Sequence, residues 1–277
     1  MTTNPAAPAT QLSGLGQGTW YMGENREKRA EEIRALQAGI DLGLKIIDTA
    51  EMYGNGLSEK LVGEAIEGRR NDVFLISKVL PNNASRKGTK TACERSLKRL
   101  GTDTIDLYLL HWQGPYSFAD TIAGMVELVA EGKIRSWGVS NMDVEEMEEI
   151  VEAPHGQTCS ANEILYNLSR RGVEYDLLPW SRDRNMPVIA YSPIEQSRIL
   201  DDKVLADIAE KHGASPAQIA LAWVIRNPGI LAIPKAGTEK HVKENAAALS
   251  IRLNSDDLKA LDRRFPPPTR KVALEML

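Results

Sequence analysis

Short apolar runs alternate with longer amphipathic stretches from Gly14 onward. Eight of these runs have the length and composition of buried β-strands. They are GQGTW, KIIDTA, VFLISK, DLYLLH, SWGVSN, SANEIL, PVIAYS and ILAIPKAG. Most do not alternate between apolar and polar residues, and such continuous runs indicate strands that are covered on both faces.

The stretches between these runs have the spacing and the punctuation of helices. Residues 25–42 carry apolar positions at helical spacing and are followed by Gly43, which suits the left-handed position after a helix. Three further stretches have start signals: Ser58 as the cap of SEKLVGEAIEG, Ser215 before the proline of SPAQIALAWVIRN, and Thr238 before EKHVKENAAAL. Strand and helix therefore alternate throughout.

Eight βα units with doubly covered strands predict an α/β fold, a closed (β/α)8 TIM barrel in one domain. An open doubly wound sheet is the alternative. The glycine-rich GLGQGTW runs into a strand instead of opening a helix, which argues against a dinucleotide site of the Rossmann type. We expect the barrel domain to span 14–277 and residues 1–13, rich in Pro, Ala and Thr, to be a loose leader.

Charge and composition limit the classes of molecule that this protein is expected to bind. The net charge is −4, and the densest acidic patch, DVEEMEEIVE, keeps its apolar residues at helical spacing, as a solvated helix face does. Nothing indicates nucleic acid, a membrane or an export signal, so we expect a cytoplasmic protein. Cys93 and Cys159 lie far apart without redox or metal spacing, and reduced structural thiols are expected.

Polar side chains stand at the carboxyl end of nearly every predicted strand. At one strand end a polar residue is ordinary, but the carboxyl ends of barrel strands share one mouth, where such enzymes keep their chemistry. The predicted ring is Trp20, Asp48, Lys78, His111, Ser140, Asn141, Asn162, Glu163, Tyr191, Ser192 and Lys235.

Four groups of this region favour proton transfer: Asp48, Tyr53, Lys78 and His111. A tyrosine is a poor acid at neutral pH unless a nearby cation favours its phenolate. Lys78 could supply that cation, and an ionised Asp48 would hold it in place. His111 could orient a carbonyl or share the proton. Such a set protonates the alkoxide that forms when a carbonyl is reduced by hydride.

Side chains cannot donate hydride, so this hypothesis requires a nicotinamide cofactor in the same mouth. The later strand ends suit it. Tyr191 offers a ring for stacking, Ser140 and Asn141 offer hydrogen bonds, and Lys235 precedes the helix start at Thr238, which suits phosphate.

These motifs together resemble the aldo-keto reductase superfamily in its bacterial form, from about Gly14 to Leu249. DTAEMYGNG, SK, LLHW, GKIRSWGVSN, AYSP and IPKAGTEKHVKEN follow one another at fitting distances. The resemblance implies a monomeric reductase of aldehydes or reactive ketones with NADPH extended across the mouth. It also implies Tyr53 as general acid, Lys78 and Asp48 as its tuning groups, and His111 as the residue that orients the carbonyl.

The resemblance also implies the remaining site residues. Trp20 and Trp112 would line the substrate pocket, and no metal is implied. The cofactor residues would be Ser140, Asn141 and Glu163 at the nicotinamide amide, Tyr191 with Ser192 at its ring, Gln196 at the pyrophosphate, and Lys235, Thr238, His241, Glu244 and Asn245 at the adenosine phosphate.

Three positions depart from the family pattern. Glu163 replaces a glutamine and, as a carboxylate, accepts but does not donate hydrogen bonds. His241 replaces an arginine that clasps the 2′-phosphate, so we expect a weaker NADPH preference with some NADH use. The loose leader and the short tail RFPPPTRKVALEML predict an open, permissive pocket.

Three other functions remain as alternatives. A metal-dependent barrel hydrolase would need more histidines near His111 than this sequence offers. A Schiff-base aldolase on Lys78 conflicts with the charge that Asp48 would stabilise. The third is a nucleotide-binding regulatory barrel with slow or no turnover, which the full set of four catalytic residues disfavours.

Overall fold

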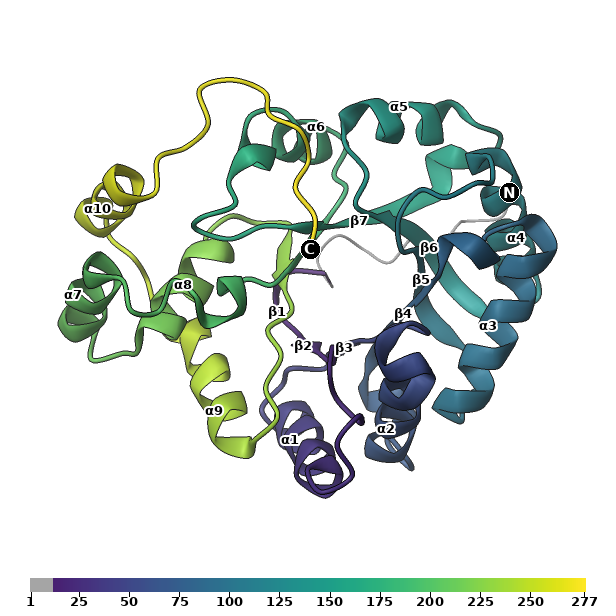
Figure 1. Cartoon of the computed structure of the whole chain (residues 1–277), viewed down its shortest axis with the longest axis horizontal. Helices are drawn as coiled ribbons and strands as arrows, with labels where there is room; N and C mark the ends of the chain where they lie inside the picture. Colours follow the sequence, from purple (N-terminus) through teal and green to yellow (C-terminus); the bar gives the residue numbers. More distant parts are fainter. Residues whose placement is uncertain (1–11) are drawn as a thin grey trace.

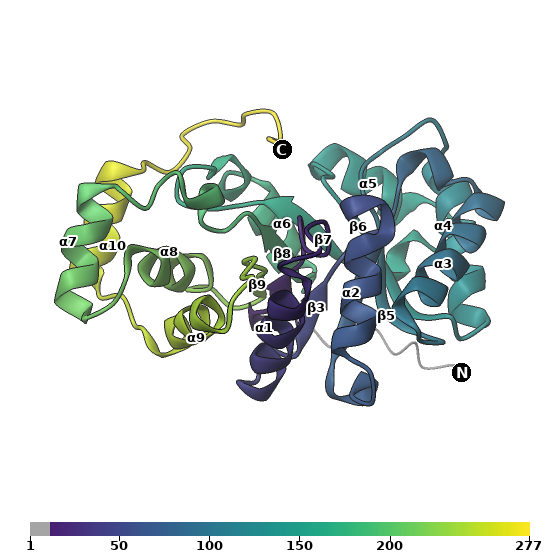
Figure 2. The same cartoon turned by 60° about the horizontal axis from the view of Figure 1, so that its bottom comes forward.

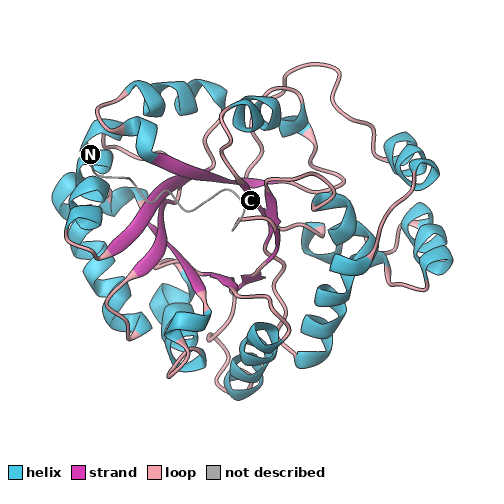
Figure 3. Ribbon diagram, turned by 180° about the vertical axis from the view of Figure 1, so that it is seen from behind, coloured by secondary structure: helices cyan, strands magenta, loops and turns pink. Residues whose placement is uncertain are grey.

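Nine short parallel strands form a nearly closed barrel with helices around it in residues 12–277, the part of the chain that the computed structural model describes (Figures 1 and 3). The strands are β1 (Gly14–Leu15), β2 (Gln17–Gly18), β3 (Ile46–Asp48), β4 (Phe74–Val79), β5 (Ile105–Leu110), β6 (Ile134–Ser140), β7 (Cys159–Leu165), β8 (Val188–Tyr191) and β9 (Ile230–Ala232). The predicted (β/α)8 barrel is confirmed.

The first strand differs from the prediction, because two short pieces stand where one strand was expected. β1 pairs with β9 and β2 pairs with β3, so these two pieces join the two ends of the sheet. At Gly18 the backbone of β2 lies very close to the backbone of Ile233, which a glycine permits because it has no side chain. A Cβ at Gly18 would lie 2.5 Å from the backbone oxygen of Ile233. A larger residue would push the closing strand away from its neighbour.

Alternation along each strand divides the core into two layers. On β5, Leu107 and Leu109 point into the barrel and belong to a small interior cluster, whereas Tyr108 and Leu110 face the surrounding helices. Both layers are apolar, which explains why the strands read as continuous apolar runs. The interior cluster fills the barrel below the polar carboxyl ends of its strands.

Ten α-helices follow the strands in the described part of the chain and form the outer layer (Figures 1 and 2). They are α1 (Arg29–Asp41), α2 (Leu57–Ala65), α3 (Arg86–Leu100), α4 (Phe118–Ala130), α5 (Val144–Glu152), α6 (Leu177–Asp183), α7 (Lys203–His212), α8 (Pro216–Val224), α9 (Glu239–Ala247) and α10 (Ser255–Arg264). No helix among residues 12–277 has both the length and the hydrophobicity needed to cross a membrane.

Two of the predicted helix caps are confirmed and one is wrong. Ser215 caps α8 with a capping box, and Thr238 caps α9 by accepting a hydrogen bond from the backbone N–H of His241. Ser58 is not a cap, because α2 begins at Leu57. Its hydroxyl is buried and instead donates to the Thr19 backbone oxygen at 3.0 Å.

The two ends of the chain differ from the sequence-based expectation. Residues 1–11 of the predicted leader lie outside the described residues, but Leu12 is fully buried in the interior cluster of the barrel. The tail after α10 returns across the barrel and ends near its axis (Figures 1 and 2). Cys93 and Cys159 are buried and unpaired, as expected.

Candidate active site

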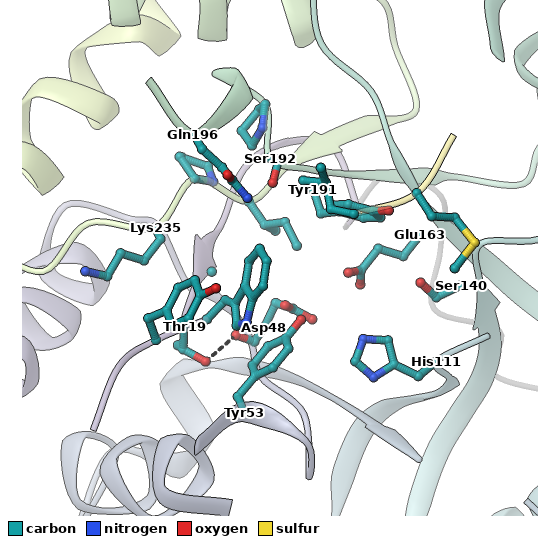
Figure 4. A pocket seen from close by; sticks show the side chains of 18 of the residues that line it. Thr19, Asp48, Tyr53, His111, Ser140, Glu163, Tyr191, Ser192, Gln196 and Lys235 are labelled. Atoms are coloured by element: carbon teal, nitrogen blue, oxygen red, sulfur yellow. Dashed lines mark hydrogen bonds between the residues drawn. The ribbon is translucent and has the colours of Figure 1, made fainter. Parts of the chain in front are cut away.

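A pocket of about 380 Å³ opens at the carboxyl ends of the strands, and it is called the mouth pocket below (Figure 4). Cavities of this size suit small ligands. Twelve of the residues proposed from the sequence line it: Trp20, Asp48, Tyr53, His111, Trp112, Ser140, Asn141, Glu163, Tyr191, Ser192, Gln196 and Lys235.

Lys78 lies directly behind this wall and is fully buried at the end of β4. Its Nζ is 2.5 Å from Asp48 Oδ1, 3.1 Å from the Thr49 backbone oxygen, 3.2 Å from the Tyr53 hydroxyl and 3.3 Å from Glu163 Oε1. Burial opposes the charge on Lys78, but the attraction of its acidic neighbours, Asp48 foremost, outweighs burial and raises its pKa. The side chain is therefore a fixed cation beneath the tyrosine.

Tyr53 is held by a turn that only certain residues can form. Gly54, Asn55 and Gly56 follow it with φ of 54°, 54° and 86°, in the left-handed region that glycine and asparagine tolerate best. The turn lets the phenol reach back toward Lys78. Burial raises the Tyr53 pKa and Lys78 partly offsets this rise, so the hydroxyl is protonated at neutral pH.

His111 faces Tyr53 across the pocket, with the two rings nearly edge to face and their centroids 5.8 Å apart. Burial, together with the nearby charge of Lys78, lowers the His111 pKa well below its ordinary value. The imidazole is therefore neutral. Its Nδ1 is buried without a hydrogen-bond partner in the protein.

Ser140, Asn141 and Tyr191 form a hydrogen-bonded group on the opposite wall. The Tyr191 hydroxyl donates to Asn141 Oδ1 at 2.8 Å, and Asn141 Nδ2 donates to the His111 backbone oxygen at 3.1 Å and to Ser140 Oγ at 3.0 Å. Asn141 adopts φ of 60°, so the chain turns sharply after β6. These bonds fix the Tyr191 ring against the pocket.

Glu163 is buried on β7 and reaches the same cluster of charges. Its Oε1 is 3.3 Å from Lys78 Nζ, whereas its Oε2 is buried without a protein partner. Burial and the nearby Asp48 raise the Glu163 pKa to about 8. A buried oxygen of this kind is expected to take a hydrogen bond from, or give one to, a bound molecule.

The loop after β8 supplies a second wall of the pocket through Ser192 and Gln196. Ser192, Glu195, Gln196 and Ser197 all have positive φ, which gives the loop its tight path. Glu195 points inward, where its Oε2 accepts a hydrogen bond from Asn167 at 2.7 Å. The loop thus presents Gln196 to the mouth on a braced backbone.

The residues proposed for the adenosine end do not line the mouth pocket, with the exception of Lys235. Thr238, His241, Glu244 and Asn245 lie on or at the start of α9, beyond the rim. The start of α9 presents backbone N–H groups and partial positive charge, which suits a phosphate. The residues predicted for the adenosine end, apart from Lys235, therefore lie outside the mouth pocket, on or next to α9.

The tail contributes two wall residues that the sequence did not indicate, Met276 and Leu277. Lys271 anchors it, with Nζ 2.7 Å from Glu145 Oε1 and 3.1 Å from Asp176 Oδ2. The tail is short, as expected from the sequence, yet it reaches the mouth and forms part of the pocket wall. A permissive pocket stays a prediction. No local pattern marks Met276 as a pocket residue, since only its path across the barrel brings it there.

The arrangement fits a nicotinamide cofactor better than a metal. The mouth offers the Tyr191 ring, which a hydrogen bond holds in place, and two buried polar atoms without protein partners, His111 Nδ1 and Glu163 Oε2. Beyond the rim, the start of α9 suits a phosphate. Among residues 12–277, no group of three or more His, Cys, Asp or Glu side chains could hold a metal ion.

Comparison with known proteins shows similarity to one enzyme family. The model of the Aldo/keto reductase family matches residues 14–264. Methylglyoxal reductase YeaE of Escherichia coli is 52% identical over 271 residues, covering 96% of this chain and 95% of its own. Glyoxal reductase of Bacillus subtilis is 34% identical, covering 85% and 84%. The crystal structure of an aldo/keto reductase from Klebsiella pneumoniae in complex with NADP and acetate superposes with a TM-score of 0.94 at 50% identity, covering 96% of each chain.

Proposed function

The chain belongs to the Aldo/keto reductase family and is an NADPH-dependent carbonyl reductase, and we propose that it reduces small 2-oxoaldehydes with Tyr53 as the proton donor. The observation that carries this proposal is the contact chain from Tyr53 to Lys78 to Asp48, set opposite a neutral His111. NADPH supplies the hydride when it is bound.

Tyr53 performs the proton transfer. Its hydroxyl gives a proton to the carbonyl oxygen as negative charge develops there, and the Lys78 ammonium at 3.2 Å stabilises the phenolate that remains. Asp48 keeps Lys78 charged and in position from 2.5 Å. His111, being neutral, can donate one ring N–H to the same carbonyl oxygen without competing as a stronger acid.

Pocket size favours a small substrate. The catalytic residues and several cofactor residues share one cavity of about 380 Å³, so the nicotinamide end and the substrate must divide it. Trp20 and Trp112 narrow it on one side, and Met276 and Leu277 cover it on another. Two relatives reduce methylglyoxal and glyoxal by name, and both compounds are small dicarbonyls.

We also propose that NADPH is held by the residues that the sequence predicts for the cofactor. Ser140, Asn141, Glu163 and Tyr191 with Ser192 would hold the nicotinamide end, and Gln196 the pyrophosphate. Lys235, Thr238, His241, Glu244 and Asn245 would hold the 2′-phosphate end. His241 is exposed and offers no guanidinium fork, which supports measurable NADH use beside the NADPH preference.

Turnover of a substrate panel tests the proposal. NADPH oxidation is followed with methylglyoxal, glyoxal, a bulky aromatic aldehyde and an aldose sugar, each with NADH in parallel. We expect the highest kcat/KM for the two dicarbonyls. A preference for the bulky aldehyde or the sugar would contradict the substrate assignment.

We also propose that the enzyme acts as a monomer in the cytoplasm. The residues proposed for catalysis and for cofactor binding all belong to this one chain, which supports a monomer. Both cysteines are buried and unpaired, which suits a reducing compartment. Light scattering after size-exclusion chromatography checks the monomer, and a dimer would refute it.

A further inference from the structure

Glu163 Oε2 is an unpaired buried oxygen in the wall of the mouth pocket. Figure 4 shows the side chain entering the pocket between Tyr191 and Ser140. A carboxylate oxygen buried in this position would lack a hydrogen-bond donor from the protein, which is a costly arrangement.

The charges around Glu163 do not balance if it is ionised. Within residues 12–277, the titratable groups that face it are Asp48 on β3, Lys78 on β4, Tyr53 after β3 and Tyr191 on β8, with the neutral His111 across the pocket. Lys78 is the cation of this group. Two buried carboxylates would therefore share one ammonium and leave a net negative charge among buried groups.

One bound proton resolves this imbalance, and geometry places it on Glu163. Lys78 Nζ is 2.5 Å from Asp48 but 3.3 Å from Glu163, so Asp48 makes the tighter ion pair. Glu163 has the weaker ion pair and the oxygen with no partner. Burial raises the pKa of both carboxyl groups, and for Glu163 the value of about 8 agrees with the placement that these distances indicate.

We propose that Glu163 is protonated in the resting enzyme and presents its carboxyl O–H to the cavity as a hydrogen-bond donor to the nicotinamide amide. Glu163 then does what a glutamine N–H would do, and the expectation that it can only accept hydrogen bonds is reversed. This inference rests on the proposed function, because it assigns Glu163 to the nicotinamide end.

The proposal has a consequence that a glutamine would not produce. The nicotinamide ring is neutral in NADPH and cationic in NADP⁺, so an ionised Glu163 would favour the oxidised cofactor. The ratio of the two dissociation constants should therefore change as Glu163 loses its proton. The phosphates and His241 act on both forms alike and cancel in this ratio.

Cofactor titrations monitored by tryptophan fluorescence test this consequence at constant ionic strength between about pH 7 and pH 10, the range that brackets the Glu163 titration. In the wild type, NADP⁺ should gain on NADPH by about tenfold across the range, the factor that corresponds to one pKa unit of coupling. In Glu163→Gln the ratio should stay constant. A constant ratio in the wild type, or the same change in Glu163→Gln, overturns the proposal.

Infrared spectroscopy of the enzyme without cofactor tests the proton itself, independently of cofactor binding and turnover. The wild type should show the carbonyl stretch of a neutral carboxylic acid at pH 7 and lose it by about pH 10. The signal should be absent from Glu163→Gln. In Asp48→Asn, Glu163 becomes the counter-ion of Lys78 and the signal should move to lower pH. Persistence of the band in Glu163→Gln would place the proton elsewhere and refute the assignment, even if the reductase activity is as proposed.

Discussion

Replacing Tyr53 by phenylalanine tests the proton-donor role with little change to the structure. The substitution removes one hydroxyl, whose contact is Lys78 Nζ at 3.2 Å, and Lys78 keeps Asp48, Glu163 and the Thr49 backbone oxygen. No cavity larger than one oxygen atom results. We expect a change in unfolding free energy below about 1 kcal/mol, because the cation remains fully paired.

The effect on catalysis should be much larger. General acid catalysis contributes about 10²–10⁴ in rate, so kcat for methylglyoxal should fall by that factor in Tyr53→Phe. This range equals about 3 to 5 kcal/mol of transition-state stabilisation, at about 1.4 kcal/mol for each factor of ten. Stopped-flow turnover with NADPH measures the loss, and fluorescence titration should show an unchanged cofactor affinity.

Tyr191→Phe is the matched control. It also removes one phenol hydroxyl, but that hydroxyl donates a hydrogen bond to Asn141 Oδ1, on the pocket wall proposed for the nicotinamide, and has no contact with Lys78. We expect weaker NADPH binding with a smaller loss of kcat. If Tyr53→Phe kept kcat within tenfold of the wild type while a deuterium isotope effect showed hydride transfer to be limiting, Tyr53 would not be the proton donor.

Three further outcomes follow from the structure. His111 is buried and neutral, and its pKa is lowered, so the unfolded chain binds a proton there before the folded chain does. The free energy of unfolding should therefore fall as pH drops below about 6.5, the ordinary histidine value, by up to about 1.4 kcal/mol per pH unit. Urea unfolding measures this slope, and His111→Gln should lack it. Lys271→Gln should release the tail from the pocket wall and raise KM for small aldehydes severalfold, with kcat and melting temperature nearly constant. The exposed Lys259→Gln is the control and should leave all three quantities unchanged. Equal effects of the two substitutions would show that Lys271 does not anchor the tail. Gly18→Ala should destabilise the fold by about 2 kcal/mol or more, because its Cβ would meet the Ile233 oxygen at 2.5 Å, and a wild-type melting curve would contradict this.

Local patterns predicted that the four candidate catalytic residues lie together, because a parallel barrel gathers the carboxyl ends of its strands at one mouth. Asp48, Lys78 and His111 each close or follow an apolar run, and Tyr53 lies one turn further. Once the runs are strands of one barrel, their ends must converge. Ser58 shows the limit of such reasoning. Its position predicted a helix cap, but its hydroxyl donates to the backbone oxygen of Thr19, which is distant in the sequence.

The amino-acid sequence by itself determined the repeating βα order and the barrel, and it predicted that Asp48, Tyr53, Lys78 and His111 lie at one end of it, since these depend on periodicity and on residues next to strands. Only the tertiary structure brings Asp48, Tyr53 and Glu163 together around Lys78, and the proposed proton on Glu163 depends on that convergence. It also decided that Met276 belongs to the pocket wall. Burial, distance and shared counter-ions are properties of the packed chain, and no single segment carries them.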